Sequence, residues 1–175
     1  MRHLTAPPAA AVRPPVPTSR RAARGVTLVE LMVALAIAAL LAMAAAPSFS
    51  EYLANSRLRE NGNTLFAMTL FAQSEAIKRN TVVRLAVADG AIEVSDQDDP
   101  DNPVVLRTVT FSHGISADDA EIDFGGEGRP VGLAAAEVDL AHPSESCSVE
   151  IRCPGLRVDG GGGVRLCGDH TGTCE

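Results

Sequence analysis

An apolar run of 21 residues, from Val26 to Ala46, most constrains what this chain can fold into. Only Thr27 and Glu30 place polar side chains inside it. A helix rises 1.5 Å per residue, so the run reaches about 31 Å, enough to cross the hydrocarbon core of a bilayer. We therefore expect a membrane-embedded helix near the start of the chain.

Glu30 stands out because an acid inside such a run is penalised. Moving a carboxylate into hydrocarbon costs at least a few kcal/mol, so an intramembrane acid predicts a functional role. The alternative is that Glu30 sits at the membrane surface and reaches the lipid headgroups.

Charge is divided unevenly along the chain. Residues 1–25 hold five arginines and no acid, a net charge of +5, and the remaining residues hold 10 basic and 22 acidic groups, a net charge of −12. Basic residues before an apolar helix predict a cytoplasmic N-terminus, with the rest of the chain outside. A domain of charge −12 is a poor partner for nucleic acid, whose binding depends on phosphate neutralisation.

Beyond the apolar run, helical periodicity resumes and then gives way to strands. Pro47 is expected to kink the helix, after which an amphipathic pattern continues to residue 80. From Thr81 the sequence alternates β-branched runs with turns, and Asp89-Gly90 predicts a hairpin. We predict a leader at 1–25, a helix at 26–80 that spans the membrane to about residue 46, and a β-rich domain at 81–175.

All four cysteines lie near the end of the chain, at Cys147, Cys153, Cys167 and Cys174. Their even number in a loop-rich tail favours disulfides and an oxidising compartment over free thiols in the cytosol. Three pairings are open. We favour Cys167 with Cys174, because the glycines of "CGDHTGTC" allow the chain to reverse. Cys147 and Cys153 cannot pair within one straight strand, since six extended residues separate them too far.

The stretch "RGVTLVELMVALAIAALLA" resembles the class III signal of type IV pilins and pseudopilins. The resemblance implies that a prepilin peptidase cuts between Gly25 and Val26 and methylates the new amine of Val26. Glu30 matches the family's acid at the fifth mature position, which implies that it neutralises the amine of a neighbouring subunit in a filament. Val26 departs from the usual phenylalanine, and the leader is long.

Three further stretches resemble the GspH/FimT family of minor pseudopilins: "SEAIKRN" at 74–80, "IDFGGEGRP" at 122–130 and "LRVDGGGGVRLC" at 156–167. The resemblance implies an α+β pilin-like fold, with a long N-terminal helix on a mostly antiparallel sheet. It implies a minor pilin or pseudopilin of a type IV pilus or a type II secretion system. Its partners would be other major and minor pilins, prepilin peptidase and the inner-membrane assembly platform. The subunit would be single-pass in the bacterial inner membrane, with a periplasmic domain, before it joins the filament.

Some family members bind DNA, and the motif associated with this is Gly-Arg-x-Arg in the closing hairpin. Here the matching residues run from Gly162 to Arg165, and a glycine replaces the first arginine. Arg152, Arg157 and Arg165 are the candidates for a small basic patch. Because the domain is acidic, we expect no DNA binding and take Arg165 as the residue to test.

No motif in the sequence points to catalysis or to a cofactor. Neither Gly-x-Ser-x-Gly nor His-Glu-x-x-His occurs, and the acidic "DQDDPD" lacks the glycine and glutamate of a calcium loop. Cys147 and Cys153 with "CGDHTGTC" offer zinc ligands, but no Cys-x2-Cys knuckle is present. We expect a non-enzymatic filament subunit without metal. The rival interpretations are a DNA-uptake subunit, a plain membrane anchor, and a soluble domain released at Ala44–Ala46 or by twin-arginine export.

Overall fold

A single long helix begins the described part of the chain. The structure is a computed structural model that describes residues 25–172 and Cys174. Helix α1 runs over 52 residues, Leu28–Arg79, and is followed by Asn80 in the left-handed region, at a φ of 55°. That conformation is a common way to end a helix. The chain divides into two units after Ala42.

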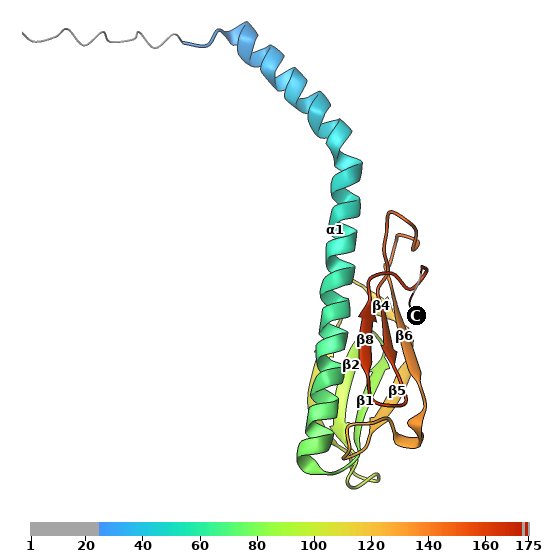
Figure 1. The fold of residues 1–175 in the computed structure, drawn as a ribbon. Coiled ribbons are helices and arrows are strands. Elements are labelled where there is room, and N and C mark those ends of the chain that lie inside the picture. Colours follow the sequence, from blue (N-terminus) through green and yellow to red (C-terminus); the bar gives the residue numbers. More distant parts are fainter. Residues whose placement is uncertain (1–24, 173, 175) are drawn as a thin grey trace, which may run out of the picture. The chain divides into compact units, whose positions relative to one another are not determined.

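Two antiparallel sheets follow the helix in the second unit (Figure 1). The first has the strand order β3-β2-β1-β5, and the second has the order β4-β6-β7-β8. The strands of the first sheet are β1 (Val83–Ala88), β2 (Ala91–Asp96), β3 (Val104–Thr110) and β5 (Ala120–Phe124). Those of the second are β4 (Ser116–Ala117), β6 (Ala136–Ala141), β7 (Gly155–Val158) and β8 (Val164–Cys167). A short 3-10 helix, η1, occupies Val131–Leu133.

The hairpin predicted at Asp89-Gly90 is confirmed. Ala88 pairs with Ala91 across the turn, and both turn residues have positive φ, 50° for Asp89 and 73° for Gly90. Two central residues of positive φ give a two-residue turn whose twist matches that of the flanking strands.

The core of the second unit is one continuous apolar cluster between α1 and the sheets. The helix contributes a stripe of buried residues at helical spacing, half of which are alanines. The stripe consists of Ala54, Leu58, Leu65, Met68, Ala72 and Ala76. The largest strand side chain in this core is Phe124, which is fully buried. The expected fold class, a long helix packed on antiparallel sheet, is confirmed.

Pro47 lies inside α1, and the helix continues on both sides of it. Proline has no amide hydrogen, so the carbonyl four residues earlier loses its helical partner there. The kink predicted at Pro47 stays a prediction.

Candidate functional site

The first turn of α1 carries the candidate assembly site. The hydroxyl of Thr27 accepts a hydrogen bond from the Glu30 amide at 3.2 Å, and the Leu31 amide donates to the Thr27 carbonyl at 3.1 Å. Thr27 is therefore the N-cap of α1, and Glu30 stands at the third position of its first turn. The sequence "TLVE" is the Ser/Thr-x-x-Glu pattern of a helix start, a signal that places this boundary from sequence alone.

The Glu30 side chain is exposed and makes no ion pair with any described residue. An acid in the first turn is favoured by the positive end of the helix dipole. Gly25 and Val26 come immediately before the cap and are exposed as well. Of the residues that the resemblance singled out, Gly25 and Val26 thus lie just before the helix and Glu30 in its first turn, where its carboxylate is available to a partner.

The apolar segment that contains Glu30 is not covered by any other described residue. Its side chains are exposed throughout, and Leu28–Ala46 is long and apolar enough to cross a membrane. The large side chains exposed by more than half are Leu28, Val29, Leu31, Met32, Val33, Leu35, Ile37, Leu40, Leu41 and Met43. A surface of this kind requires lipid or other protein around it.

Three side-chain amides attach the second half of α1 to the loops of the domain. Asn55 donates to the Glu150 carbonyl at 2.7 Å and accepts from the Arg152 amide at 2.8 Å. Asn61, only 3% exposed, accepts from the Ser112 amide at 2.9 Å and donates to its hydroxyl at 3.2 Å.

Gln73 is the third of these amides. Its nitrogen donates to two carbonyls in different turns, Gly128 at 2.9 Å and Gly162 at 2.7 Å. The three amide clamps, Asn55, Asn61 and Gln73, satisfy loop carbonyl and amide groups that lack a sheet partner.

Gly62 lets a loop approach α1 closely. A Cβ at this position would lie 3.0 Å from Cγ of Pro154 and 3.2 Å from its Cβ. Glycine in mid-helix costs roughly 0.5–1 kcal/mol relative to alanine, and here it makes room for the proline ring.

An ion-pair network closes the C-terminal end of α1. The buried Glu75 carboxylate accepts hydrogen bonds from Arg79 Nε at 2.8 Å and Lys78 Nζ at 3.0 Å. Arg79 also donates to Asp96 at the end of β2, at 3.2 Å. The hydrogen bond from Arg79, and after it that from Lys78, holds the pKa of the Glu75 carboxyl below its usual value.

Both cysteine pairs are disulfides in the structure, and the pairing is Cys147 with Cys153 and Cys167 with Cys174. The latter is the pair favoured from the sequence. Cys147 and Cys153 lie outside any strand, with Cα atoms 5.6 Å apart, because the chain turns between them. In that turn the Ser148 amide donates to the Ile151 carbonyl at 2.9 Å.

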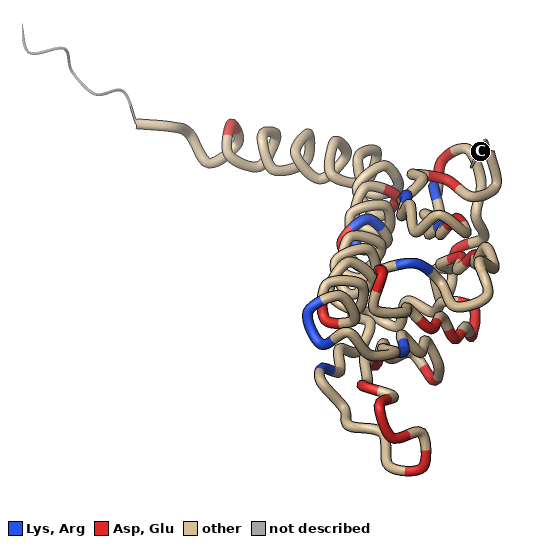
Figure 2. The backbone as a smooth tube through the Cα atoms, turned by 60° about the horizontal axis from the view of Figure 1, so that its bottom comes forward, with Lys and Arg blue, Asp and Glu red and all other residues tan. Residues whose placement is uncertain are grey.

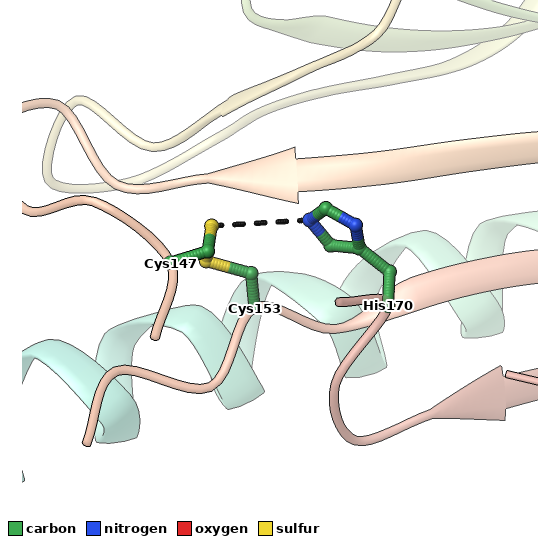
Figure 3. Close-up of side chains that lie close together, drawn as sticks. All are labelled: Cys147, Cys153 and His170. Carbon is green, nitrogen blue, oxygen red and sulfur yellow. Dashed lines mark hydrogen bonds between the residues drawn. A yellow bond between two sulfur atoms is a disulfide. The ribbon is translucent and has the colours of Figure 1, made fainter. Parts of the chain in front are cut away.

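His170 lies against the first disulfide (Figure 3). Its Nε2 is 3.8 Å from Cys147 Sγ, and its Nδ1 is 3.2 Å from the Asp139 carboxylate. Its backbone amide donates to the Cys153 carbonyl at 2.7 Å. Asp139 also pairs with Arg157. Sequence reasoning did not bring Asp139 and His170 together, because the sheet topology alone makes them neighbours.

The three arginines considered for a basic patch do not form one. Arg157 and Arg165 face each other across β7 and β8, but Arg157 is paired with Glu137 and Asp139. Arg152 instead lines a separate groove of about 620 Å³ that it shares with Leu166. Figure 2 shows acidic residues spread over the loops of the domain.

An exposed apolar helix segment with an acid in its first turn, continuing into a helix clamped on antiparallel sheet, defines a pilin-like subunit. Residues 20–46 match the prokaryotic N-terminal methylation motif, and residues 61–170 match the family described as type II transport protein GspH. The chain belongs to the GspH family, whose members are structural pilins rather than enzymes. Within it, the protein is a minor pilin or pseudopilin, a membrane-anchored subunit with an exported domain.

Solved structures support the same fold. A crystal structure of the type IV minor pilin FimU from Pseudomonas aeruginosa matches with a TM-score of 0.55 and 15% identity, covering 64% of this chain and 89% of FimU. A second crystal form of FimU matches with a TM-score of 0.52 and 13% identity, covering 62% and 91%. No curated protein matches the chain.

Proposed function

We propose that the chain is cut between Gly25 and Val26 and that Glu30 then binds the new amine of a neighbouring subunit. The single observation that carries this proposal is the exposed Glu30 carboxylate, unpaired in the described chain, at the start of an uncovered apolar helix. Val26 directly precedes the N-cap Thr27, so cleavage there leaves the capped first turn in place. N-methylation of Val26 keeps a positively charged amine at that end.

The pairing is favoured by the surroundings that the apolar segment creates. Two opposite charges 4 Å apart attract by about 1 kcal/mol in water and by about 4 kcal/mol at an effective dielectric constant near 20. An unpaired charge in the same place costs several kcal/mol, because its hydration is lost. A neighbour in the wrong axial position would leave both charges unpaired, so Glu30 sets the register of assembly.

The partners that fit the apolar segment are lipid first and other pilins afterwards. Before assembly, residues 26–46 would lie in the inner membrane, with the basic leader on the cytoplasmic side and the domain in the periplasm. Two disulfides in the domain support export to an oxidising compartment. Prepilin peptidase and the inner-membrane assembly platform would process and move the subunit.

The proposed role is structural and involves neither catalysis nor DNA uptake. No observation favours a DNA contact at Arg165, which lines a hollow together with the acids Glu137 and Asp159. The parent machine is a type IV pilus or a type II secretion system, and the proposal for Glu30 is the same for both.

The test begins with the mass and N-terminal sequence of the protein from native membranes. We expect a chain that starts at N-methylated Val26. A start near Pro47 would show that the domain is released as a soluble protein and would overturn the role of Glu30.

A pair of variants then isolates the carboxylate. Glu30→Gln should be processed normally but should lose incorporation into filaments, measured in sheared filament fractions. Glu51→Gln, which changes another exposed acid of the same helix, is the matched control and should assemble normally. Normal incorporation of Glu30→Gln would contradict the proposal.

A further inference from the structure

The C-terminal part of the domain contains a cluster that neither the filament role nor the family match uses. Cys147 Sγ, Cys153 Sγ and a ring nitrogen of His170 all lie within 4.8 Å of one another (Figure 3). Cys153 is fully buried, while Cys147 and His170 are half-buried, so one side of the cluster faces solvent.

The orientation of His170 is the most informative feature of this cluster. Asp139 lies 3.2 Å from Nδ1, and Nε2 lies 3.8 Å from Cys147 Sγ. In the tautomer that donates Nδ1–H to Asp139, the lone pair of Nε2 is free to bind a metal on the side of Cys147. A carboxylate that holds the far nitrogen of a histidine is the usual outer support of a zinc ligand. Arg157 in turn holds Asp139 in place.

We propose that the dithiol form of the Cys147–Cys153 pair, together with His170, binds a Zn²⁺ ion. Two thiolates and an imidazole are ligands that zinc prefers, and a water molecule on the exposed side would complete a tetrahedral site. Asp139 acts as a positioning residue, since it contacts the ligand and not the metal.

The distances between the ligand atoms fit zinc after a small movement. With zinc bonds of about 2.0 Å to nitrogen and about 2.3 Å to sulfur, tetrahedral ligands lie about 3.5 Å apart for nitrogen and sulfur and about 3.8 Å for two sulfurs. The distance from His170 Nε2 to Cys147 Sγ, 3.8 Å, is therefore nearly met as it stands. The two sulfurs must separate, and the loop between the cysteines lies outside the strands, so it can supply this movement.

The disulfide and the metal exclude each other. The chain is synthesised with thiols, so the dithiol form precedes the disulfide and needs no reductant. Metal binding displaces the two thiol protons and leaves two thiolates on Zn²⁺. Closing the disulfide passes two electrons from these thiolates to a disulfide oxidant, which takes up two protons from water and becomes a dithiol, and Zn²⁺ is released.

This exclusion gives the site a consequence for folding. Four cysteines allow three pairings, and a metal that holds Cys147 and Cys153 keeps them from pairing with Cys167 or Cys174. The proposal is independent of the role of Glu30, because every residue it uses lies beyond the membrane segment.

Cobalt titration of the full chain in detergent micelles tests the proposal. We expect the protein reduced with a phosphine to bind one Co²⁺ with a thiolate charge-transfer band and a tetrahedral visible spectrum, and Zn²⁺ to displace it. The oxidised protein should bind none. Absence of the bands in the reduced protein, with or without retained structure, would overturn the proposal.

Variants assign the ligands. His170→Ala should abolish the tetrahedral spectrum, and Asp139→Asn should weaken binding about 10–100-fold. The double change Cys167→Ser with Cys174→Ser, and the exposed-residue change His113→Ala, are controls that should leave binding unchanged. Retention of the spectrum in His170→Ala, or its loss in the Cys167 and Cys174 double variant while far-UV circular dichroism is unchanged, would contradict the assignment.

Discussion

The two halves of α1 share one helical backbone but differ in what surrounds their side chains. Residues 28–46 present apolar side chains in every direction and find no cover in the described chain. Residues 54–76 bury a narrow stripe, and the three amide clamps among them bind loops of the domain, while the remaining face is exposed. The first half is built for surroundings that change, from lipid to protein, whereas the second half is fixed to one partner, its own domain.

The largest expected loss of stability comes from truncating a buried leucine in the second half of α1. Leu58→Ala or Leu65→Ala removes a fully buried side chain and should lower the free energy of unfolding of the domain by about 2–5 kcal/mol. Leu40→Ala, in the exposed half, is the control and should leave domain stability unchanged. Urea unfolding in detergent, followed by circular dichroism, measures both. Equal losses would mean that the apolar half also packs on the domain.

A smaller effect tests the amide clamps. Asn61→Ala leaves the Ser112 amide without its acceptor and should cost about 1–3 kcal/mol of stability. Asn63→Ala changes the same residue type two positions later, where the side chain is exposed, and should change stability little. If the same unfolding assay gave equal values for the two variants, the clamps would contribute nothing specific.

The close approach at Gly62 gives a comparable or smaller effect. Gly62→Val forces Pro154 away from α1 and should destabilise the domain by about 1–3 kcal/mol, although valine is the better helix former. Ala67→Val, on the exposed face of the same helix, reports the intrinsic cost of a β-branched residue. Thermal melts of both variants measure the difference between their losses of stability. That difference would vanish if the loop at Pro154 could move without a cost in free energy.

The smallest effect concerns pH. The pKa of Glu75 is lower in the folded protein than in the unfolded chain, so its contribution to stability is complete above its unfolded value. That contribution should fade as the pH drops through the lowered value, in the acid range below about 4.5. Glu75→Gln should flatten this part of the stability curve. If the variant lost stability at low pH as steeply as the original protein, other carboxylates would be responsible for that loss.

The sequence predicted the features that depend on neighbours in the chain. The length of the apolar run predicted an apolar helix at residues 26–46, and the Asp89-Gly90 pair predicted a hairpin. The glycines between Cys167 and Cys174 favoured a disulfide between these two cysteines. Each of these is set by local backbone geometry or by the period of side chains.

The features that were missed depend on contacts distant in sequence. Asn61 and Gln73 look like ordinary polar positions of an amphipathic helix, and only the returning loops turn them into clamps. Asp139 and His170 are 31 positions apart and meet across Gly155 of β7, because β6 and the C-terminal segment lie on either side of that residue. The single-strand argument about Cys147 and Cys153 holds, but it did not foresee the turn that joins them.

The spacing of the amide clamps has a mechanical consequence. Asn55 and Gln73 are 18 residues apart, which places them about 27 Å apart along the helix. A pull on the helix along its axis would therefore act on these hydrogen bonds in shear, spread over about five turns of helix, and not on one hydrogen bond at an end.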